Sequence, residues 1–285
     1  MSRIVYVNGA YVPEEEAKLS IFDRGLLFAD AVYEVTAVIE RKLLDFPGHM
    51  ARLRRSLAEL RLPSPATDEE ILAIHRELLQ RNALTFGHIY LMVTRGAADR
   101  DFVWPKDGTP PSFILFTQAR DGVESREARE GLRVVSVPDL RWARRDIKTV
   151  QLLYPSLAKM EAKRQGKDDA WMVEDGFVTE GTSNNAYIVT ESERIVTRAL
   201  SNAILHGITR AAILRGAAEA GLEVEERPFT LAEAQGAREA FVTSAGAFVT
   251  PVVEIDGLPV GDGAPGPIAR RLRAIYLDEA LRTGL

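Results

Sequence analysis

Short stretches rich in apolar residues follow one another through the first part of the chain and predict β-strands. Residues 4–7 and 10–12 flank Asn8-Gly9, a dipeptide that strongly favours a two-residue hairpin turn. Residues 31–39 (AVYEVTAVI) are rich in β-branched side chains and predict a longer strand. Three further segments have a similar character and are predicted as strands: residues 43–46, 88–95 and 112–117.

Two segments between these strands show the spacing of a helix instead. Residues 47–62 begin with a proline, which the first helical turn tolerates, and residues 68–82 form the second segment. In both, apolar side chains recur every three or four residues and therefore share one helical face. These side chains are Met50, Leu53, Leu57 and Leu60 in the first segment, and Ile71, Leu72, Ile74, Leu78 and Leu79 in the second.

A polar segment, residues 119–130, separates this region from the rest of the chain. We expect it to link a smaller N-terminal α/β domain, residues 1–118, to a larger C-terminal domain, residues 131–285. Strands and helices are mixed in the larger domain without regular alternation, which indicates an α+β fold. Its predicted strands are residues 132–137, 170–173, 177–178, 186–189, 194–197, 241–244 and 252–255, and its predicted helices are 154–165, 209–220 and 267–282.

Composition narrows the classes of function. The chain has 285 residues, a net charge of -5 and no cysteine. The acidic balance argues against general nucleic-acid binding, and the lack of cysteine excludes disulfides, cysteine–zinc sites and thiol catalysis. The N-terminus lacks the apolar core of a signal peptide, and no apolar run is long enough to span a bilayer. We therefore expect a cytoplasmic protein that uses neither a membrane nor a metal.

Two residues carry the candidate chemistry. A lone lysine is usually a solvated surface charge, but Lys148 follows Ile147 and precedes an apolar stretch, so it is a candidate amine nucleophile. Glu180 precedes Gly-Thr-Ser-Asn-Asn, a sequence that favours a tight turn with exposed N–H and hydroxyl groups. A lysine amine and an acidic partner for a pyridine nitrogen are the two groups that pyridoxal 5'-phosphate (PLP) chemistry requires.

The motifs around these residues resemble a known family. Residues 180–187 (EGTSNNAY), 195–197 (IVT) and 205–210 (LHGITR) together resemble the signature of class IV, or fold type IV, PLP-dependent aminotransferases. The similarity extends over nearly the whole chain and implies the two-domain fold of these enzymes. Within the family the D-amino-acid aminotransferases are the most similar, through residues 32–35 (VYEV), 88–90 (HIY), 93–96 (VTRG) and 146–148 (DIK).

The resemblance assigns roles around the cofactor. Lys148 would bind PLP covalently and carry the proton during transamination, while Glu180 would pair with the pyridine nitrogen. Arg52 would hold the phosphate, because a guanidinium matches phosphate geometry. Further cofactor-binding residues that the resemblance implies are Leu205, which would pack on the ring, and Ile208, Thr209, Ser244 and Ala245, which would surround the phosphate. Ala245 and Gly246 lack the hydroxyl groups that are common in this branch, so backbone N–H groups would replace them.

The resemblance also implies a substrate site. In D-amino-acid aminotransferases a tyrosine, an arginine and a histidine hold the α-carboxylate, the last two reaching in from the partner subunit. Tyr33 and Arg100 match the first two, and Val35 lies beside Tyr33 on the same strand. Phe102 occupies the histidine position and has no hydrogen-bond donor, which is a departure from the pattern. A homodimer is expected because Arg100 would serve the neighbouring subunit.

The predicted function is a ping-pong transfer of the amino group of a D-amino acid to a 2-oxo acid, such as 2-oxoglutarate or pyruvate. Phe102 and Trp104 raise an alternative, an (R)-selective amine transaminase, since an apolar trap would accept amines without a carboxylate. A branched-chain L-amino-acid aminotransferase and an aminodeoxychorismate lyase share the fold and the lysine. A PLP-fold protein that only binds is the fourth alternative, and the presence of both Lys148 and Glu180 argues against it.

Overall fold

A computed structural model describes residues 2–285, which form two compact units. The first unit extends to Val123 and includes Ile147–Gln151 and Thr283–Leu285, and the second contains Glu124–Asp146 and Leu152–Arg282. The boundary at Val123 lies inside the polar segment 119–130. Two short segments that return to the first unit were not predicted from the sequence.

The first unit is built on a six-stranded sheet with the order β2-β1-β6-β5-β3-β4. The predicted hairpin is present, because β1 (Ile4–Val7) pairs antiparallel with β2 (Ala10–Pro13). Asn8 and Gly9 join them with φ angles of 49° and 95°, the left-handed values that this turn requires. The other strands of the sheet are β3 (Ala31–Ile39), β4 (Lys42–Leu43), β5 (Gly87–Thr94) and β6 (Phe113–Ala119).

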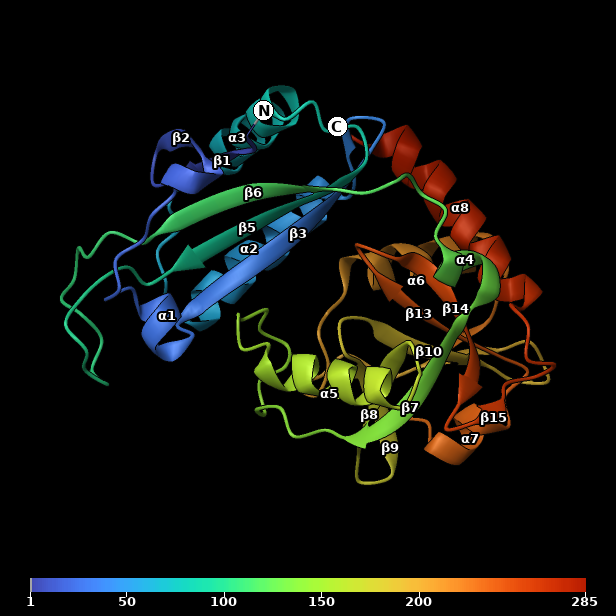
Figure 1. Cartoon of the computed structure of the whole chain (residues 1–285). Helices are drawn as coiled ribbons and strands as arrows, with labels where there is room; N and C mark the ends of the chain where they lie inside the picture. The colour runs from blue at the N-terminus through green and yellow to red at the C-terminus, as the bar shows by residue number, and fades with distance from the viewer. Residues whose placement is uncertain (1) are drawn as a thin grey trace. The chain divides into compact units, whose positions relative to one another are not determined.

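Two helices pack against this sheet, as Figure 1 shows for α2 (Phe46–Glu59) beside β3 and for α3 (Asp68–Arg81) near β1 and β6. Both lie within two or three residues of the predicted segments. Their apolar faces and the sheet form one buried cluster that includes Leu53, Leu78 and Leu91. The shorter elements of the unit, a 3-10 helix at Glu14–Glu16 and α1 (Arg24–Phe28), were not predicted because they are too short to show periodicity.

The second unit contains a nine-stranded sheet. Eight strands run in the order β12-β11-β10-β13-β14-β7-β8-β9, and β15 pairs with β14. Most neighbours are antiparallel, but β14–β7, β7–β8 and β11–β12 are parallel, so the α+β assignment is confirmed. The strands are β7 (Leu132–Pro138), β8 (Asp169–Glu174), β9 (Phe177–Gly181), β10 (Asn185–Val189), β11 (Ile195–Thr197), β12 (Val224–Glu226), β13 (Glu239–Ser244), β14 (Phe248–Ile255) and β15 (Leu258–Pro259).

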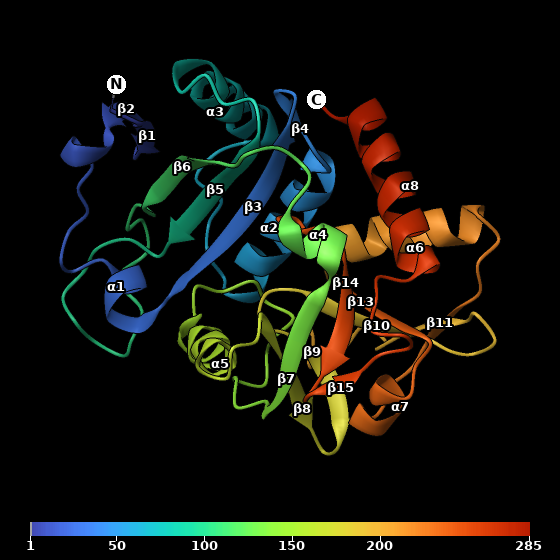
Figure 2. The same ribbon diagram turned by 45° about the vertical axis from the view of Figure 1, so that its right-hand side comes forward.

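Helices surround this second sheet. α5 (Leu153–Arg164) packs beside β7 and β8 in Figure 2, and α6 (Ile208–Glu219) packs on β12 and β13. The remaining helices are α4 (Arg126–Glu130), α7 (Leu231–Gln235) and α8 (Pro267–Thr283). α4 lies inside the segment expected to be a linker and is capped by the Ser125 hydroxyl.

Aromatic residues fill the centre of this sheet. The rings of Tyr187 and Phe241, on neighbouring strands, stack with their centroids 4.5 Å apart, and Trp171 meets Phe229 edge to face at 6.2 Å. All four side chains are fully buried. None of the helices formed by residues 2–285 combines the length and apolar character that crossing a membrane requires.

Replacement of Leu53 tests the packing of α2 against the first sheet. Leu53→Ala is expected to lower the free energy of unfolding by about 2–5 kcal/mol, because the side chain is buried and its removal leaves a cavity. The neighbouring exposed Arg54→Ala is expected to cost only about 0–1 kcal/mol. Urea unfolding of both variants checks this, and equal losses would show that Leu53 does not lie in a packed core.

Candidate active site

Lys148 lies in the short segment Ile147–Gln151, which the fold places in the first unit. The segment is attached to the beginning of β3: the Tyr33 N–H donates to the Lys148 carbonyl at 3.0 Å, and the Val150 N–H donates to the Ala31 carbonyl at 3.2 Å. The Lys148 N–H also points to the Ser56 hydroxyl at 3.4 Å. These contacts fix the backbone of Lys148 beside the beginning of β3.

The structure brings two of the predicted residues together, Lys148 and Tyr33. The Lys148 Nζ lies 4.1 Å from the centroid of the Tyr33 ring, within cation–π range. Tyr33 and Val35 are two residues apart on β3 and therefore share one face of the sheet. Tyr90 pairs with Val35 across β5 and lies on this face too, stacked on Phe116 at 5.0 Å. Lys148 thus stands beside a face lined with aromatic rings.

The opposite face of β3 buries a charge. Glu34 accepts hydrogen bonds from Arg52 Nε and Nη2, each at 2.7 Å, and its Oε2 lies 2.7 Å from His49 Nδ1. Both partners come from α2, which packs on this face. Burial alone would raise the pKa of Glu34, but the Arg52 guanidinium and the His49 ring lower it to about 2. The ion pair sets the side-chain position of Arg52, the predicted phosphate ligand, whose role no contact in the structure tests.

Arg100 and Phe102 lie on the loop between β5 and β6. The Arg100 guanidinium is 5.2 Å from the ring of Phe28 and 5.8 Å from the ring of Phe102, which is 80% exposed. The Phe28 and Phe102 rings meet edge to face at 5.6 Å. In the described residues these interactions do not connect Arg100 or Phe102 to Tyr33. Their predicted substrate roles therefore stay predictions.

Glu180 lies at the end of β9 in the second unit and is 3% exposed. Three groups among residues 2–285 donate to it: Arg141 Nη1 to Oε1 at 2.5 Å, and both Asn185 Nδ2 and the Leu205 N–H to Oε2, at 3.0 and 3.1 Å. Burial raises the pKa of the Glu180 carboxyl, and the Arg141 guanidinium and the Leu205 N–H oppose that rise. The pKa of this carboxyl stays raised overall, so the donors offset only part of the effect of burial.

The loop that carries Leu205 is fixed by the same asparagine. Asn185 Nδ2 also donates to the Leu205 carbonyl at 2.9 Å, so the structure brings Leu205 and Glu180 together, while the predicted packing of Leu205 on the cofactor ring stays a prediction. A Cβ at Gly207 would come 2.1 Å from the Asn185 Oδ1, so a side chain there would require the Asn185 amide or the loop to move. Either movement would disturb the hydrogen bonds of Asn185 to Glu180 and Leu205.

The predicted phosphate residues of the second unit lie at the ends of elements. Ile208 begins α6, whose N-cap is Gly207 and carries no side-chain cap, and Thr209 is 3% exposed. Such a helix end presents N–H groups and a partial positive charge that suit a phosphate. Ser244 ends β13, and its hydroxyl accepts from the Ala247 N–H at 3.1 Å across the turn that contains Ala245. These contacts do not by themselves join the turn to α6, so the shared phosphate role of the set stays a prediction.

The chemistry of these groups fits PLP. A carboxylate has about four acceptor positions, and the three donors at Glu180 leave it able to accept one more, such as a protonated ring nitrogen. In the first unit, Lys148 has the primary amine that the cofactor carbonyl requires. In the second unit, the α6 terminus has N–H groups that suit a phosphate. Among residues 2–285, His, Asp and Glu side chains do not gather in a group of three or more that could hold a metal ion.

Reasoning from the sequence missed several residues that matter here. Glu34 is the one acidic residue in an otherwise mostly apolar strand, a signal that a buried charge needs a partner. Arg141 and Asp139 belong to a polar stretch just before Lys148 in which three arginines stand at positions 141, 144 and 145. This density of charge near a candidate nucleophile could have indicated an ion-pair network.

Comparison with known families and sequences agrees with these observations. Residues 31–255 match the family model described as amino-transferase class IV. A D-alanine aminotransferase of Staphylococcus aureus (strain COL) is 37% identical over 269 residues, which cover 94% of this chain and 95% of the relative. A D-alanine aminotransferase of Bacillus licheniformis is 36% identical over 277 residues, 97% of each chain.

Solved structures show the same fold. The branched-chain aminotransferase of Thermoproteus uzoniensis, determined with norvaline, has a TM-score of 0.88 and 27% identity, covering 99% of this chain and 96% of its own. The branched-chain amino acid aminotransferase of Thermobaculum terrenum, determined in its PLP form, has a TM-score of 0.82 and 27% identity, covering 98% and 94%.

The acid sensitivity of the fold tests the Glu34–Arg52 pair. The folded-state pKa of Glu34, about 2, lies below the unfolded value of about 4.3, so the pair stabilises the fold above the unfolded pKa and is lost as pH falls toward 2. Wild-type protein is expected to lose about 3 kcal/mol of unfolding free energy through this group between about pH 5 and pH 2. Glu34→Gln should be less stable at neutral pH and lack this loss.

Urea unfolding of both proteins over this pH range measures the difference. Two buried histidines, His75 and His88, have pKa values lowered to about 4 and also destabilise the acidified fold, but they are present in both proteins and cancel in the difference. A gap between the two proteins that stays constant with pH would contradict the assignment.

Proposed function

Because the chain belongs to the class IV aminotransferase family, we propose that it is a PLP-dependent transaminase that moves the amino group of a D-amino acid to a 2-oxo acid. The predicted family, transferase class and cofactor are confirmed by the family match over residues 31–255. The observation that carries the chemistry is Glu180, a buried carboxylate with three donors and an acceptor position suited to a protonated pyridine nitrogen. The two D-alanine aminotransferase relatives support the substrate class.

The proposal gives each residue a task. Bound PLP would supply an electron sink that stabilises the negative charge formed at the substrate Cα. Lys148 would provide the amine that holds the cofactor and would move the proton at Cα, and Glu180 would keep the ring nitrogen protonated. Arg52, Ile208, Thr209, Ser244 and the Ala245 N–H would hold the phosphate, and Leu205 would pack on the ring.

The substrate side of the proposal rests on the aromatic face of β3. Tyr33 stands beside Lys148 and would donate its hydroxyl to the substrate α-carboxylate, while Val35 would line the side-chain pocket. Arg100 would supply the positive charge for the carboxylate from a second subunit, which makes a homodimer part of the proposal. A cytoplasmic location completes the proposal and is compatible with the lack of cysteine in the sequence.

One observation favours a second function, an (R)-selective amine transaminase. Phe102 is 80% exposed and stands where this branch has a histidine that binds carboxylate. An apolar ring at that position would accept a hydrophobic group in place of a carboxylate. The structural similarity to branched-chain aminotransferases, at 27% identity in the two structures compared above, reflects the shared fold and is weaker in sequence than the similarity to the D-alanine enzymes.

Spectroscopy of a single half-reaction tests the proposed function. Wild-type protein is expected to show a visible-edge absorbance band with PLP, and D-alanine should bleach this band and release pyruvate. Lys148→Ala should abolish the band, because no amine remains to bind the cofactor. Lys163→Ala, a change at an exposed lysine of α5, serves as the matched control and should behave as wild type.

The outcomes separate the alternatives. Pyruvate formed from L-alanine but not from D-alanine would sink the D-amino-acid assignment. Rapid bleaching by (R)-1-phenylethylamine, with slow bleaching by D-alanine, would favour the amine transaminase. Retention of the band in Lys148→Ala would refute the role of that lysine.

Replacing Phe102 with histidine, the residue that D-amino-acid aminotransferases have at this position, tests whether Phe102 determines which amino donor is preferred. Phe102→His is expected to lower KM for D-alanine about tenfold and to weaken turnover of (R)-1-phenylethylamine, because a hydrogen bond to a charged group contributes about 1.5–3 kcal/mol. Val103→His, at a neighbouring exposed position, is the control and should change neither value. Steady-state kinetics with both donors measure the ratio, and an unchanged ratio in Phe102→His would exclude Phe102 from the substrate site.

A further inference from the structure

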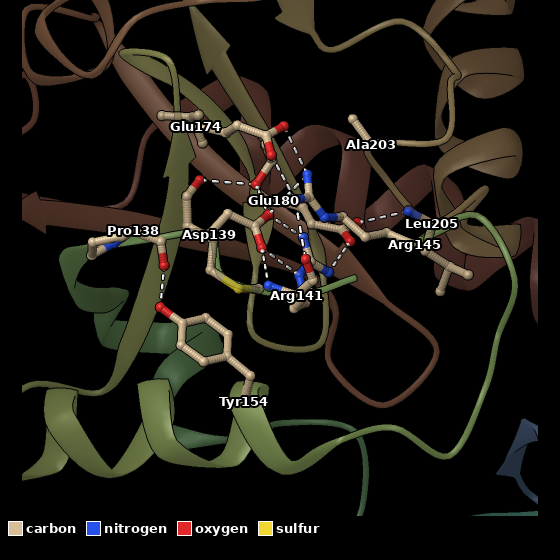
Figure 3. A network of polar contacts seen from close by, with 12 residues as sticks. Pro138, Asp139, Arg141, Arg145, Tyr154, Glu174, Glu180, Ala203 and Leu205 are labelled. Carbon is tan, nitrogen blue, oxygen red and sulfur yellow. Dashed lines mark hydrogen bonds and ion pairs between the residues drawn. The ribbon is translucent and has the colours of Figure 1, made fainter. Parts of the chain in front are cut away.

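Arg141 is the charged donor to Glu180, and the structure holds it in place from the other side. The guanidinium donates through Nε to Asp139 Oδ1 at 2.9 Å and through Nη2 to Asp139 Oδ2 at 2.6 Å, a bidentate pair. Its remaining nitrogen, Nη1, donates to Glu180 Oε1 at 2.5 Å. Figure 3 shows Arg141 between the two carboxylates, with one edge on each.

Asp139 is itself anchored. It accepts a hydrogen bond from the Thr179 hydroxyl at 2.7 Å, one residue before Glu180 on β9, and its own N–H donates to the Val173 carbonyl on β8 at 2.8 Å. The side chain of Asp139 is fully buried and that of Arg141 is 12% exposed. The guanidinium therefore has little freedom to rotate, and the direction of its Nη1–H bond fixes the position of Glu180 Oε1.

The sharing of one cation by two anions has an electrostatic consequence. If Arg141 paired with Glu180 alone, the pair would be neutral and would attract a further cation weakly. Because Asp139 takes two of the guanidinium's hydrogen bonds, Glu180 keeps part of its negative field. Arg141 therefore favours the ionised form of Glu180 and Asp139 opposes it, and the carboxylate stays able to bind a second positive group.

Two further charged residues, Arg145 and Glu174, lie near the set formed by Glu180, Arg141 and Asp139. Arg141 and Asp139 face Glu180 directly. Behind Asp139, Arg145 Nη1 lies 3.5 Å from Asp139 Oδ2 and makes its close ion pair with Glu174, at 2.6 Å through Nη2. Tyr154 of α5 donates to the Pro138 carbonyl and contributes no charge at neutral pH. Arg145 and Glu174 belong to the network in Figure 3, but neither donates to nor accepts from Glu180.

We infer that Arg141 is a positioning residue for the cofactor: anchored by Asp139, it holds the Glu180 carboxylate in the orientation that receives the protonated ring nitrogen of PLP. The inference rests on the proposed function, because it assigns Glu180 to that nitrogen. It adds a residue that the sequence motifs did not indicate.

The test compares the ring nitrogen in the wild-type protein and in folded variants, each reconstituted with PLP labelled with ¹⁵N in the ring. Wild type should show the chemical shift of a protonated nitrogen across the neutral pH range. In Arg141→Gln the loss of the cation favours the protonated form of Glu180, so the ring nitrogen should lose its proton at lower pH. Arg141→Lys keeps the charge and should recover part of the wild-type titration.

Kinetics give a second readout. Arg141→Gln is expected to lower kcat for D-alanine about 10- to 100-fold with a smaller change in KM, because a hydrogen bond to a charged group is lost from the catalytic step. Glu174→Gln is the matched control: it breaks the Arg145–Glu174 ion pair in the same network without touching Glu180, and should leave both the ¹⁵N titration and kcat near wild type.

A buried Asp139 left without its partner could prevent Arg141→Gln from folding. The double variant Asp139→Asn/Arg141→Gln removes both charges and keeps hydrogen-bonding groups in their place, so it addresses that case. It should shift the titration in the same direction by a smaller amount, since Asp139 itself opposes ionisation of Glu180.

A ¹⁵N titration that matches wild type, in folded Arg141→Gln or in the double variant, would overturn the inference. This holds even if thermal stability falls, because a purely structural residue would lower stability without changing the titration. Failure of the proposed function looks different: the wild-type protein itself would bind no PLP, or would not transaminate D-alanine. A wild-type enzyme that is active, combined with unshifted variants, refutes only the role of Arg141.

Discussion

A carboxylate buried on a β-strand must be compensated, and this constraint organises both units of the protein. Removing an ionised carboxylate from water costs several kcal/mol unless charge and hydrogen bonds replace the solvent. On β3, Arg52 and His49 bind the Glu34 carboxylate and replace its solvent. On β9, the donors to Glu180 are Arg141, Asn185 and the Leu205 N–H. In each case the partners of the carboxylate include a residue proposed to bind PLP or to position such a residue.

The two ion pairs are built differently, and the difference matches their proposed tasks. Arg52 uses two nitrogens on Glu34, so it is held firmly on one carboxylate of its own unit. Arg141 places its bidentate edge on Asp139 and only one nitrogen on Glu180. The first arrangement fixes an arginine. The second arrangement fixes Glu180 and leaves its carboxylate able to interact with a further positive group.

Much of the fold could be predicted from the sequence, because its main elements have clear periodicity. The residues 31–39 strand is observed over Ala31–Ile39, and the Asn8-Gly9 hairpin has the expected left-handed φ angles. The elements that escaped prediction are five residues or shorter, such as α1, α7 and β12, where no period can be recognised. The return of Ile147–Gln151 to the first unit also escaped, since it depends on backbone contacts with β3 that no local pattern records.

Some residues of the candidate site could likewise be recognised from the sequence, and others could not. Lys148, Glu180 and the family were recognised from motifs, and the match over residues 31–255 confirms the family. Glu34, Asp139 and Arg141 were not recognised, because partners of a buried charge are chosen by the packing of elements distant in sequence. Glu34 and Arg52 are 18 residues apart, and Arg141 and Glu180 are 39 apart. The roles of Arg100 and Phe102 remain predictions, since a second subunit would have to supply their context.

The proposed chemistry depends on a covalent, reducible link between PLP and Lys148. Borohydride reduction of the protein loaded with PLP, followed by peptide mapping with mass spectrometry, detects this link. We expect the phosphopyridoxyl group on the peptide that contains Lys148 and on no other lysine. Label on a different lysine, or a protein that carries no label after reduction, would contradict this expectation.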